Sequence, residues 1–338
     1  MPNLTWISIA GTPLAQPAHP PSALQLSSYD LPADRVRLGA GASGEVYAIN
    51  FSSARGRYPH GQHPPSLSLS HPRRHGHNQA GPSDYQDFTP NGTIRAAVKI
   101  FHAVTSDGRP EDEVGITAMA AGVPGCLRVF AFFSSPRWGM VMELLSGFVP
   151  LGLPPSALSI TRDTYAPHVH LSVRGLLAVA VVVARACRDL HDKMGIAHGD
   201  LYAHNIMVRA HVVTGAGAGA RLRAAGGGPG IGVKVKEEKN RDEPPVQLAD
   251  VRLTDFGAAF RYHPQVLGAQ ALEVRAFGIL LAELRSLVVE EAGEANVDVL
   301  GTVTEMSEQC VRHRPADRPR FAAVARVLDG LWEKAEWG

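Results

Sequence analysis

The sequence predicts an α+β fold with two lobes, in which a small lobe rich in β-strands precedes a larger helical lobe. Up to about residue 145, short apolar segments alternate with glycine-containing turns, a pattern typical of strands. Beyond Leu145 the apolar segments become longer and helical in character. With 338 residues, 45% of them apolar, the chain is long enough to build one large domain of this kind.

The first lobe is expected to follow a flexible tail at residues 1–32, which is rich in Pro, Ser and Ala and has no periodicity. Residues 52–91 are loaded with Pro, His, Ser and Gly, and we expect a disordered insert there. Its histidines could suggest a metal site, but a biased composition explains them more simply. The predicted elements of this lobe are strands at 35–38, 45–49, 94–101, 127–133 and 139–144 and a helix at 112–121.

The second lobe begins after a hinge near Leu145 and is expected to be mainly helical. Its most apolar stretch, residues 175–187, is too short to span a bilayer and contains Arg185, so we interpret it as part of a buried helix. Residues 210–246 are rich in Ala and Gly and cannot bury enough apolar surface to fold alone. The predicted elements are helices at 172–194, 271–289, 296–311 and 321–332 and short strands at 206–208 and 251–253.

The overall charge gives no reason to expect a nucleic acid or a membrane as the main partner. The chain has 33 basic and 32 acidic residues, which leaves a net charge of +1. Its three cysteines, Cys126, Cys187 and Cys310, lie far apart and form no C-x-x-C pair, which argues against a disulfide framework and a zinc ribbon. We therefore expect an intracellular, cytoplasmic protein that does not span a membrane.

A glycine-rich turn is the first feature that carries chemistry. Gly39, Gly41 and Gly44, followed by Val46, match G-x-G-x-x-G-x-V between two predicted strands. Glycines let a backbone come close to phosphate groups and present its amides to them. By itself the motif is weak, because a plain structural turn explains it equally well. A dinucleotide-binding fold is disfavoured, because a strand and not a helix follows the last glycine.

A lysine in the next strand is the second feature. Lys99 is flanked by apolar residues, which is usual for a charged side chain at a sheet edge. Downstream of a glycine turn it becomes a candidate cation for the phosphates of a nucleotide. Such a lysine needs an anion to hold it, and Glu113 on the following helix is the first choice, with Glu111 second.

Two loops supply the third and fourth features. Asp200 and Asn205 lie five positions apart between a long predicted helix and a short strand. An aspartate there can orient a hydroxyl and accept its proton, and an asparagine can bind a metal ion. Asp255, in Asp-Phe-Gly, follows the end of a strand, where a carboxylate can chelate Mg²⁺ that bridges phosphate oxygens.

Taken in chain order, these features resemble the eukaryotic-type protein kinase superfamily, whose signature runs glycine loop, strand lysine, helix glutamate, catalytic loop and Asp-Phe-Gly. The resemblance covers about residues 33–331, with a first lobe at 33–144 and a second at 146–331. Met142 occupies the gatekeeper place, and the stretch around Glu273 resembles the buried helix of the second lobe. The phrase H-G-D-L-Y-A-H-N is similar to that of a kinase-like group in plants, algae and bacteria.

The resemblance implies that ATP and Mg²⁺ are the cofactors and that a protein is the substrate. Asp200, Lys99, Glu113 and Asn205 would be the catalytic residues, and Asn205 and Asp255 would bind the metal. The adenine would lie between Val46, Ala97 and Met207 and bind the backbone of the hinge. The nucleotide-binding set implied in this way is Leu38, Gly39, Gly41, Gly44, Val46, Ala97, Lys99, Met142, Glu143, Leu145 and Met207.

The sequence departs from the family pattern in the segment after Asp255. Gly199 replaces an arginine that in many kinases contacts a phosphorylated loop, and Glu273 follows Asp255 after fewer positions than is usual. No A-P-E motif is present, and Tyr262 is the only hydroxyl between Gly257 and Glu273. Switching by phosphorylation of this segment is therefore not expected. Arg318, which usually pairs with the A-P-E glutamate, must find another carboxylate or face solvent.

Three further positions differ from the pattern. Thr117 replaces an apolar residue that usually packs between the lobes, and Tyr202 and His204 match neither serine/threonine kinases nor tyrosine kinases well. The sequence predicts a protein kinase that favours Ser/Thr weakly over Tyr. Two alternatives remain open, namely a pseudokinase scaffold that binds nucleotide and partner proteins, and a small-molecule kinase of the aminoglycoside or choline type.

Overall fold

The computed structural model describes residues 24–26, 28–41, 43–52, 93–103, 108–157, 159–160, 162–167, 169–214, 246–263, 267–288 and 294–334. Most of the expected tail at 1–32 lies outside the described residues. So does nearly all of the two segments of biased composition, predicted at 52–91 and 210–246.

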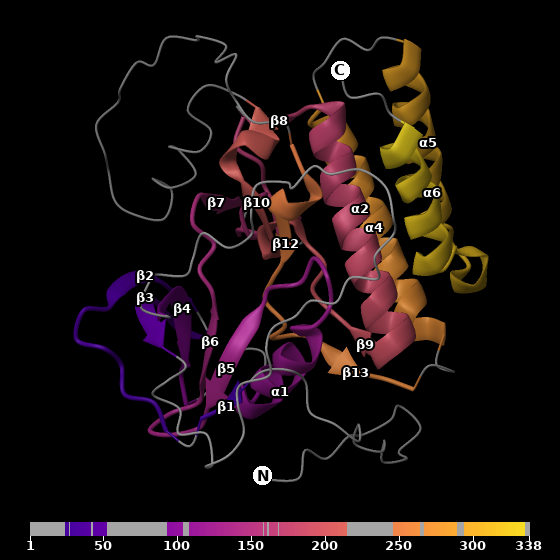
Figure 1. Cartoon of the computed structure of the whole chain (residues 1–338). Helices are drawn as coiled ribbons and strands as arrows, with labels where there is room; N and C mark the ends of the chain where they lie inside the picture. The colour runs from indigo at the N-terminus through magenta and orange to yellow at the C-terminus, as the bar shows by residue number, and fades with distance from the viewer. Residues whose placement is uncertain are drawn as a thin grey trace, which may run out of the picture.

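The described chain is α+β, as predicted, and its sheet and helices are segregated in space (Figure 1). The main sheet and α1 lie at one end, and the long helices α2, α4, α5 and α6 lie together at the other, an arrangement compatible with two lobes. The helices are α1 (Pro110–Ala120), α2 (Val173–Asp189), α4 (Leu267–Ser286), α5 (Glu294–Cys310) and α6 (Phe321–Lys334). The strands are β1 (Leu24–Gln25), β2 (Val36–Ala40), β3 (Gly44–Ser52), β4 (Thr93–Phe101), β5 (Val129–Phe133), β6 (Gly139–Glu143), β7 (Phe148–Pro150), β8 (His170–Leu171), β9 (Ile196–Ala197), β10 (Ile206–Arg209), β11 (Val213–Thr214), β12 (Val251–Leu253) and β13 (Phe260–Arg261).

The main sheet has six strands in the order β1-β5-β6-β4-β3-β2, and β4 lies in its middle. Side chains of β4 alternate between the two faces because successive residues of a strand point to opposite sides. Ala96, Val98 and Ile100 join one apolar cluster, whereas Ala97 and Phe101 join a second cluster that α1 also contacts. Lys99 lies two positions from both Ala97 and Phe101, so its side chain is on the same face and points towards α1.

Strand β1 is the one element of this sheet that the sequence did not predict. It pairs in parallel with β5, and Leu26 beside it is buried. The strand lies inside the segment that was expected to be a flexible tail, so that expectation does not hold for these residues. Two residues are too few to show an alternating pattern, and the partner strand lies about a hundred residues away.

Helix α2 is buried on almost every side, as its apolar sequence indicates. Ser172 caps its start by accepting a hydrogen bond from the backbone of Gly175 at 3.0 Å. Its end continues into a π-helical turn at Leu190–Met194, which Gly195 terminates with a positive φ of 59°. The helix predicted at 172–194 thus combines an α-helix with this turn.

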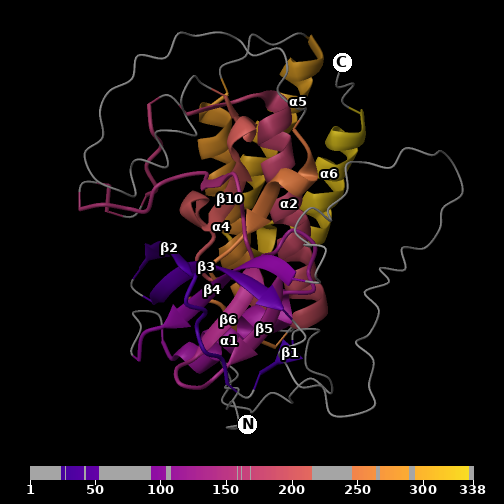
Figure 2. The same cartoon turned by 60° about the vertical axis from the view of Figure 1, so that its left-hand side comes forward.

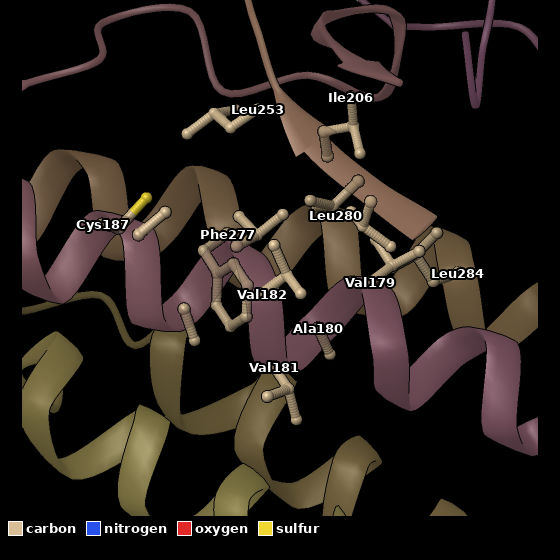
Figure 3. Packing of buried hydrophobic residues seen from close by; sticks show 14 of the residues in the cluster. Val179, Ala180, Val181, Val182, Cys187, Ile206, Leu253, Phe277, Leu280 and Leu284 are labelled. Carbon is tan, nitrogen blue, oxygen red and sulfur yellow. The ribbon is translucent and has the colours of Figure 1, made fainter. Parts of the chain in front are cut away.

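The core of the helical end is built around α2 (Figure 3). Phe277, Leu280 and Leu284 of α4 contact α2, and Ile206 and Leu253 from strands β10 and β12 cover the same side. Ala180 and Val181 point to the opposite side of the helix. In Figure 2, α6 follows α2 along its length, and α5 lies beside α4.

Three short antiparallel strands, in the order β12-β10-β7, lie between the sheet and the helices. Met207 pairs with Arg252 of β12 and with Pro150 of β7. Leu127, at the start of the chain segment leading to β5, donates a hydrogen bond to the carbonyl of Leu253 at 2.9 Å. This contact joins the two ends of the molecule beside the hinge. Within the described ranges, no helix is both long and apolar enough to cross a membrane.

Candidate functional site

A cavity of about 400 Å³ opens between the main sheet, α1, the hinge and the loop after β12. Of the residues expected to bind a nucleotide, those that line it are Leu38, Gly41, Gly44, Val46, Ala97, Lys99, Met142, Glu143, Leu145 and Met207. Glu113 and Asp255 also line it, whereas Gly39, Asp200 and Asn205 do not. The structure therefore brings most of the predicted residues together around one space.

The glycine turn forms one rim of this cavity, between β2 and β3. The amide of Gly41 donates a hydrogen bond to the carbonyl of Gly44 at 2.9 Å. A Cβ atom at Gly44 would lie 2.3 Å from the carbonyl oxygen of Ile100, so the pairing of β3 with β4 itself requires glycine there. Gly39 and Gly41 have no atom within 4 Å of such a Cβ. Packing does not demand these two glycines, and the space beside them is open to a ligand.

Lys99 and Glu113 form an ion pair across the inner face of the sheet. The Nζ atom of Lys99 lies 2.5 Å from Oε1 of Glu113, and the two side chains are only 13% and 5% exposed. The same Nζ lies 4.8 Å from the ring centroid of Phe101. Glu111, the second choice, pairs instead with Arg109. Pro110 at the start of α1 and the acidic first turn favour a helix beginning here, which places Glu113 one turn in.

Thr117 lies one turn further along α1 and lines the same cavity. Its residue is 3% exposed, and its hydroxyl has no hydrogen-bond partner among the described residues. A buried hydroxyl without a partner is unfavourable by roughly 1–3 kcal/mol. The threonine that departs from the family pattern is thus a polar defect in the wall of the cavity.

The hinge end of the cavity is fixed by the side chain of Glu143. Its carboxylate accepts hydrogen bonds from Arg128 at 3.0 Å and from Arg252 at 3.2 Å. Arg128 precedes β5 and Arg252 belongs to β12, so the carboxylate joins the sheet to the strands beside the helices. Because both partners are positively charged, these bonds are stronger than those between neutral groups.

Asp200 and Asn205 are brought together on the loop between β9 and β10. The side-chain nitrogen of Asn205 donates to Oδ2 of Asp200 at 2.8 Å and to its carbonyl oxygen at 2.9 Å. Contact with His204, and then the bond from Asn205, lower the pKa of Asp200 below its usual value although burial opposes the change. The carboxylate is therefore ionised at neutral pH.

This loop is joined to the residue before Asp255. The backbone and the hydroxyl of Thr254 both donate to the carbonyl of Asn205, at 2.9 and 3.0 Å. Asp255 itself is exposed and has a φ of +59°, a left-handed conformation that is uncommon outside glycine. Phe256 is buried against the ring of His198, and this contact fixes the turn that presents the carboxylate.

Asn205 and Asp255 have a donor set that suits Mg²⁺. The side-chain nitrogen of Asn205 is engaged by Asp200, and among the described residues no hydrogen bond reaches its amide oxygen. Asp255 offers an exposed carboxylate whose Oδ1 accepts one bond from Gly257 at 3.2 Å. Magnesium prefers oxygen ligands and keeps several waters, so one carboxylate and one amide can serve it. The described part of the chain holds no group of three or more His, Cys, Asp or Glu side chains arranged for a metal.

A buried hydrogen-bond network, which the sequence did not predict, supports the loop that carries Asp200. Glu273 of α4 accepts the backbone amide of Gly199 at 2.9 Å and lies 2.5 Å from Nε2 of His191. The other ring nitrogen of His191 contacts the hydroxyl of Tyr262. Burial raises the pKa of Glu273, but the bond and charge of His191, the charge of His198 and the bond from the Gly199 amide together outweigh burial and keep this pKa below its usual value. The network is satisfied when Tyr262 donates to Nδ1 and Nε2–H donates to Glu273.

Gly199 and Tyr262 explain two of the departures from the family pattern. Gly199 has a φ of +80°, and a Cβ there would lie 2.3 Å from the carbonyl oxygen of Ala258, so no arginine fits. Tyr262 is 4% exposed, next to the pairing of β13 with β9. Burial raises the pKa of its hydroxyl well above its usual value. The only hydroxyl between Gly257 and Glu273 is therefore not presented to solvent.

His204 lies between two carboxylates, and one of them, Asp163, was not predicted as a site residue. Its Nδ1 lies 2.8 Å from Oδ1 of Asp163, and its backbone amide donates to Oδ2 of the same residue at 2.8 Å. Its Nε2 lies 3.6 Å from Asp200, too far for a direct hydrogen bond. Burial alone would lower the pKa of His204, but the two carboxylates outweigh it and raise the pKa to about 9.

Arg318 follows neither of the two expectations from the sequence, a new carboxylate or solvent. Its guanidinium donates to the backbone carbonyls of Ala271 and Arg312 at 2.8 Å each and to that of His313 at 3.4 Å. It therefore ties the loop after α5 to the first turns of α4. Among the described residues, its guanidinium pairs with backbone carbonyl oxygens and with no carboxylate.

A comparison with models of known protein families finds no match to this chain. The chemistry of the site must therefore be inferred from its own residues and geometry.

Proposed function

We propose that this protein is an ATP- and Mg²⁺-dependent protein kinase with a two-lobed, protein-kinase-like fold. The observation that carries the proposal is the convergence of Lys99, Glu113 and Asp255 on one cavity of about 400 Å³. Asp200 and Asn205, which do not line the cavity themselves, are joined to the Asp255 segment through Thr254. A paired lysine, a metal-binding pair and a carboxylate for the acceptor are the groups that phosphoryl transfer requires.

In this proposal the sheet side of the cavity binds the nucleotide. Val46, Ala97 and Met207 contact the adenine, and the backbone from Glu143 to Leu145 supplies its hydrogen bonds. Lys99, held by Glu113, neutralises charge on the phosphates, while the glycine turn places backbone amides beside them. Asn205 and Asp255 hold Mg²⁺, which supplies further charge neutralisation when it is bound.

The loop from Asp200 to Asn205, beside the cavity, acts on the acceptor. Asp200 is ionised at neutral pH, so it can accept a hydrogen bond from an attacking hydroxyl and orient it. Its proton-accepting atom is the carboxylate oxygen that Asn205 leaves free. The acceptor is a protein hydroxyl, with Ser/Thr favoured weakly over Tyr. The burial of Tyr262 supports activity that is not switched by phosphorylation of this segment.

The test is transfer of the γ-phosphate by purified protein to a generic protein and to aminoalcohol acceptors. Asp200→Ala is compared with wild type, and Asp298→Ala, which removes an exposed aspartate of α5, serves as the control. We expect transfer to protein that falls by about three orders of magnitude in Asp200→Ala and is unchanged in the control.

Other outcomes would identify the alternatives. Transfer to the aminoalcohols alone would indicate a small-molecule kinase. Nucleotide binding without any transfer would indicate a pseudokinase scaffold, in which Lys99→Met would lower nucleotide affinity without changing the binding of partner proteins. Absence of nucleotide binding in wild type would refute the proposal altogether.

A further inference from the structure

Asp163 and His204 form a polar pair directly beside Asp200. Both oxygens of Asp163 are used, one by the ring and one by the backbone amide of His204, each at 2.8 Å. The side chain of Asp163 is 0% exposed, and that of His204 is 20% exposed. A buried carboxylate bonded twice to one residue fixes both the backbone and the ring orientation of that residue.

The position of Asp163 is in turn fixed by its neighbours in the chain. Thr164 exchanges two backbone hydrogen bonds with Leu153, at 2.9 and 3.1 Å. On either side, Arg162 and Tyr165 both contact Glu283 of α4, at 2.7 and 3.0 Å. The segment is anchored on two sides, so Asp163 is presented from a rigid support and not from a free loop.

Asp200, by contrast, depends on its neighbours for its orientation. Its side chain is 39% exposed, so burial does not restrict it. Asn205 engages Oδ2 at 2.8 Å, and the ring of His204 lies 3.6 Å from the same oxygen. If the ring of His204 turned, one of the two groups that restrict this carboxylate would be lost.

We propose that Asp163 and His204 are positioning residues that hold the loop from Asp200 to Asn205 in the geometry needed for transfer. The inference rests on the proposed function, because it assigns to Asp163 the orientation of the group that acts on the acceptor. Asp163 acts through His204 and touches no reacting atom. Orientation of this kind contributes strongly to rate, since a misplacement of about 1 Å can lower it about a hundredfold.

The chain offers a matched control in a second histidine–aspartate pair. Nε2 of His211 lies 3.0 Å from Oδ2 of Asp250. Both residues lie in short helical turns at the end of the β10–β12 pair that is away from Asn205. The variants to compare are Asp163→Asn, which keeps the shape of the side chain, His204→Ala and His211→Ala. The readouts are kcat, the KM for ATP and the hydrogen exchange of amides 198–206.

We expect Asp163→Asn and His204→Ala to lower kcat about 10- to 100-fold while the KM for ATP changes less than about threefold. Amides 198–206 should exchange faster, those of α2 should be unchanged, and added imidazole should restore part of the kcat of His204→Ala. His211→Ala should leave all of these readouts near wild type.

Two results would overturn the inference. One is loop exchange that stays at the wild-type rate in Asp163→Asn and His204→Ala, whatever happens to kcat. The other is an equal change of loop exchange in His211→Ala. If the wild-type protein transfers no phosphate, the proposed function fails, but the exchange rates of the loop still decide whether Asp163 and His204 position it.

Discussion

Two regions at the cavity are held together by different kinds of interaction. The sheet wall lines the cavity, and the loop wall is the loop 198–205 beside it, which Thr254 joins to the lining residue Asp255. On the sheet wall, apolar side chains of β4, β6 and α1 pack together, and the Lys99–Glu113 ion pair crosses between them. On the loop wall, buried polar side chains from several elements converge on the backbone. Glu273 fixes Gly199 there, and Asp163 fixes His204.

This difference indicates that the two walls differ in how far they can move. A helix that rests mainly on apolar packing can shift slightly while the long side chain of Lys99 keeps its contact with Glu113. Helix α1 also carries the hydroxyl of Thr117, which has no partner among the described residues. A loop whose amides are bound by buried carboxylates has one favourable arrangement. In the proposed function, the sheet wall adapts when the nucleotide binds, whereas the loop wall is preorganised before the acceptor arrives.

The largest expected effect comes from removing the buried carboxylate of the loop wall. Glu273→Ala should destabilise the protein by about 3–5 kcal/mol, because the Gly199 amide and the His191 ring would lose a charged partner in the core. Denaturant unfolding measures this change. Glu308→Ala, on the exposed face of α5, is the control and should have little effect. If Glu273→Ala lowered the free energy of unfolding by less than about 1 kcal/mol, the proposed difference between the two walls would be wrong.

A substitution at Gly199 should have the next largest effect. Gly199→Ala places a Cβ at a φ of +80° and 2.3 Å from the carbonyl oxygen of Ala258. We expect destabilisation of about 2–3 kcal/mol together with loss of transfer. Gly301→Ala, in α5 with open space around it, should instead be neutral or stabilising by up to about 1 kcal/mol. Equal melting temperatures for the two variants would contradict this account.

Much of the sheet wall could be predicted because its chemistry lies within short stretches of sequence. Lys99 follows from its place in a strand, and Glu113 follows from the next helix, fourteen positions later. On the loop side, Asp200, Asn205 and Asp255 could be predicted as well, because they belong to compact motifs. The periodic apolar pattern also located most of the longer strands and helices.

The supporting half of the loop wall could not be predicted because its bonds join distant positions. Asp163 and His204 are 41 positions apart, and His191 and Tyr262 are 71 apart. Neither Asp163 nor His191 belongs to a motif. The sequence alone does not distinguish a buried polar residue from an exposed one. Strands of two residues, such as β9 and β13, carry no pattern either and exist only through their pairing.

The smallest expected effect is a stabilisation, and it tests the packing of the sheet wall. Thr117→Val removes a buried hydroxyl that has no partner among the described residues and keeps the side-chain volume, so it should stabilise the protein by about 1 kcal/mol. Thr304→Val, whose wild-type hydroxyl donates to the carbonyl of Leu300 at 2.8 Å, should give no stabilisation. Calorimetric melting of both variants is the measurement. A destabilised Thr117→Val would mean that the hydroxyl is satisfied, for example by water.

In the proposed function, Asp255 and the sheet wall bind Mg-ATP, whereas Asp200 acts in transfer and not in nucleotide binding. The most direct measurement is calorimetric titration of Mg-ATP into wild type, Asp255→Ala and Asp200→Ala. We predict that Asp255→Ala abolishes the binding that depends on magnesium, whereas Asp200→Ala keeps an affinity within about threefold of wild type and loses transfer. Equal losses of nucleotide affinity in the two variants would contradict the division of roles between Asp255 and Asp200.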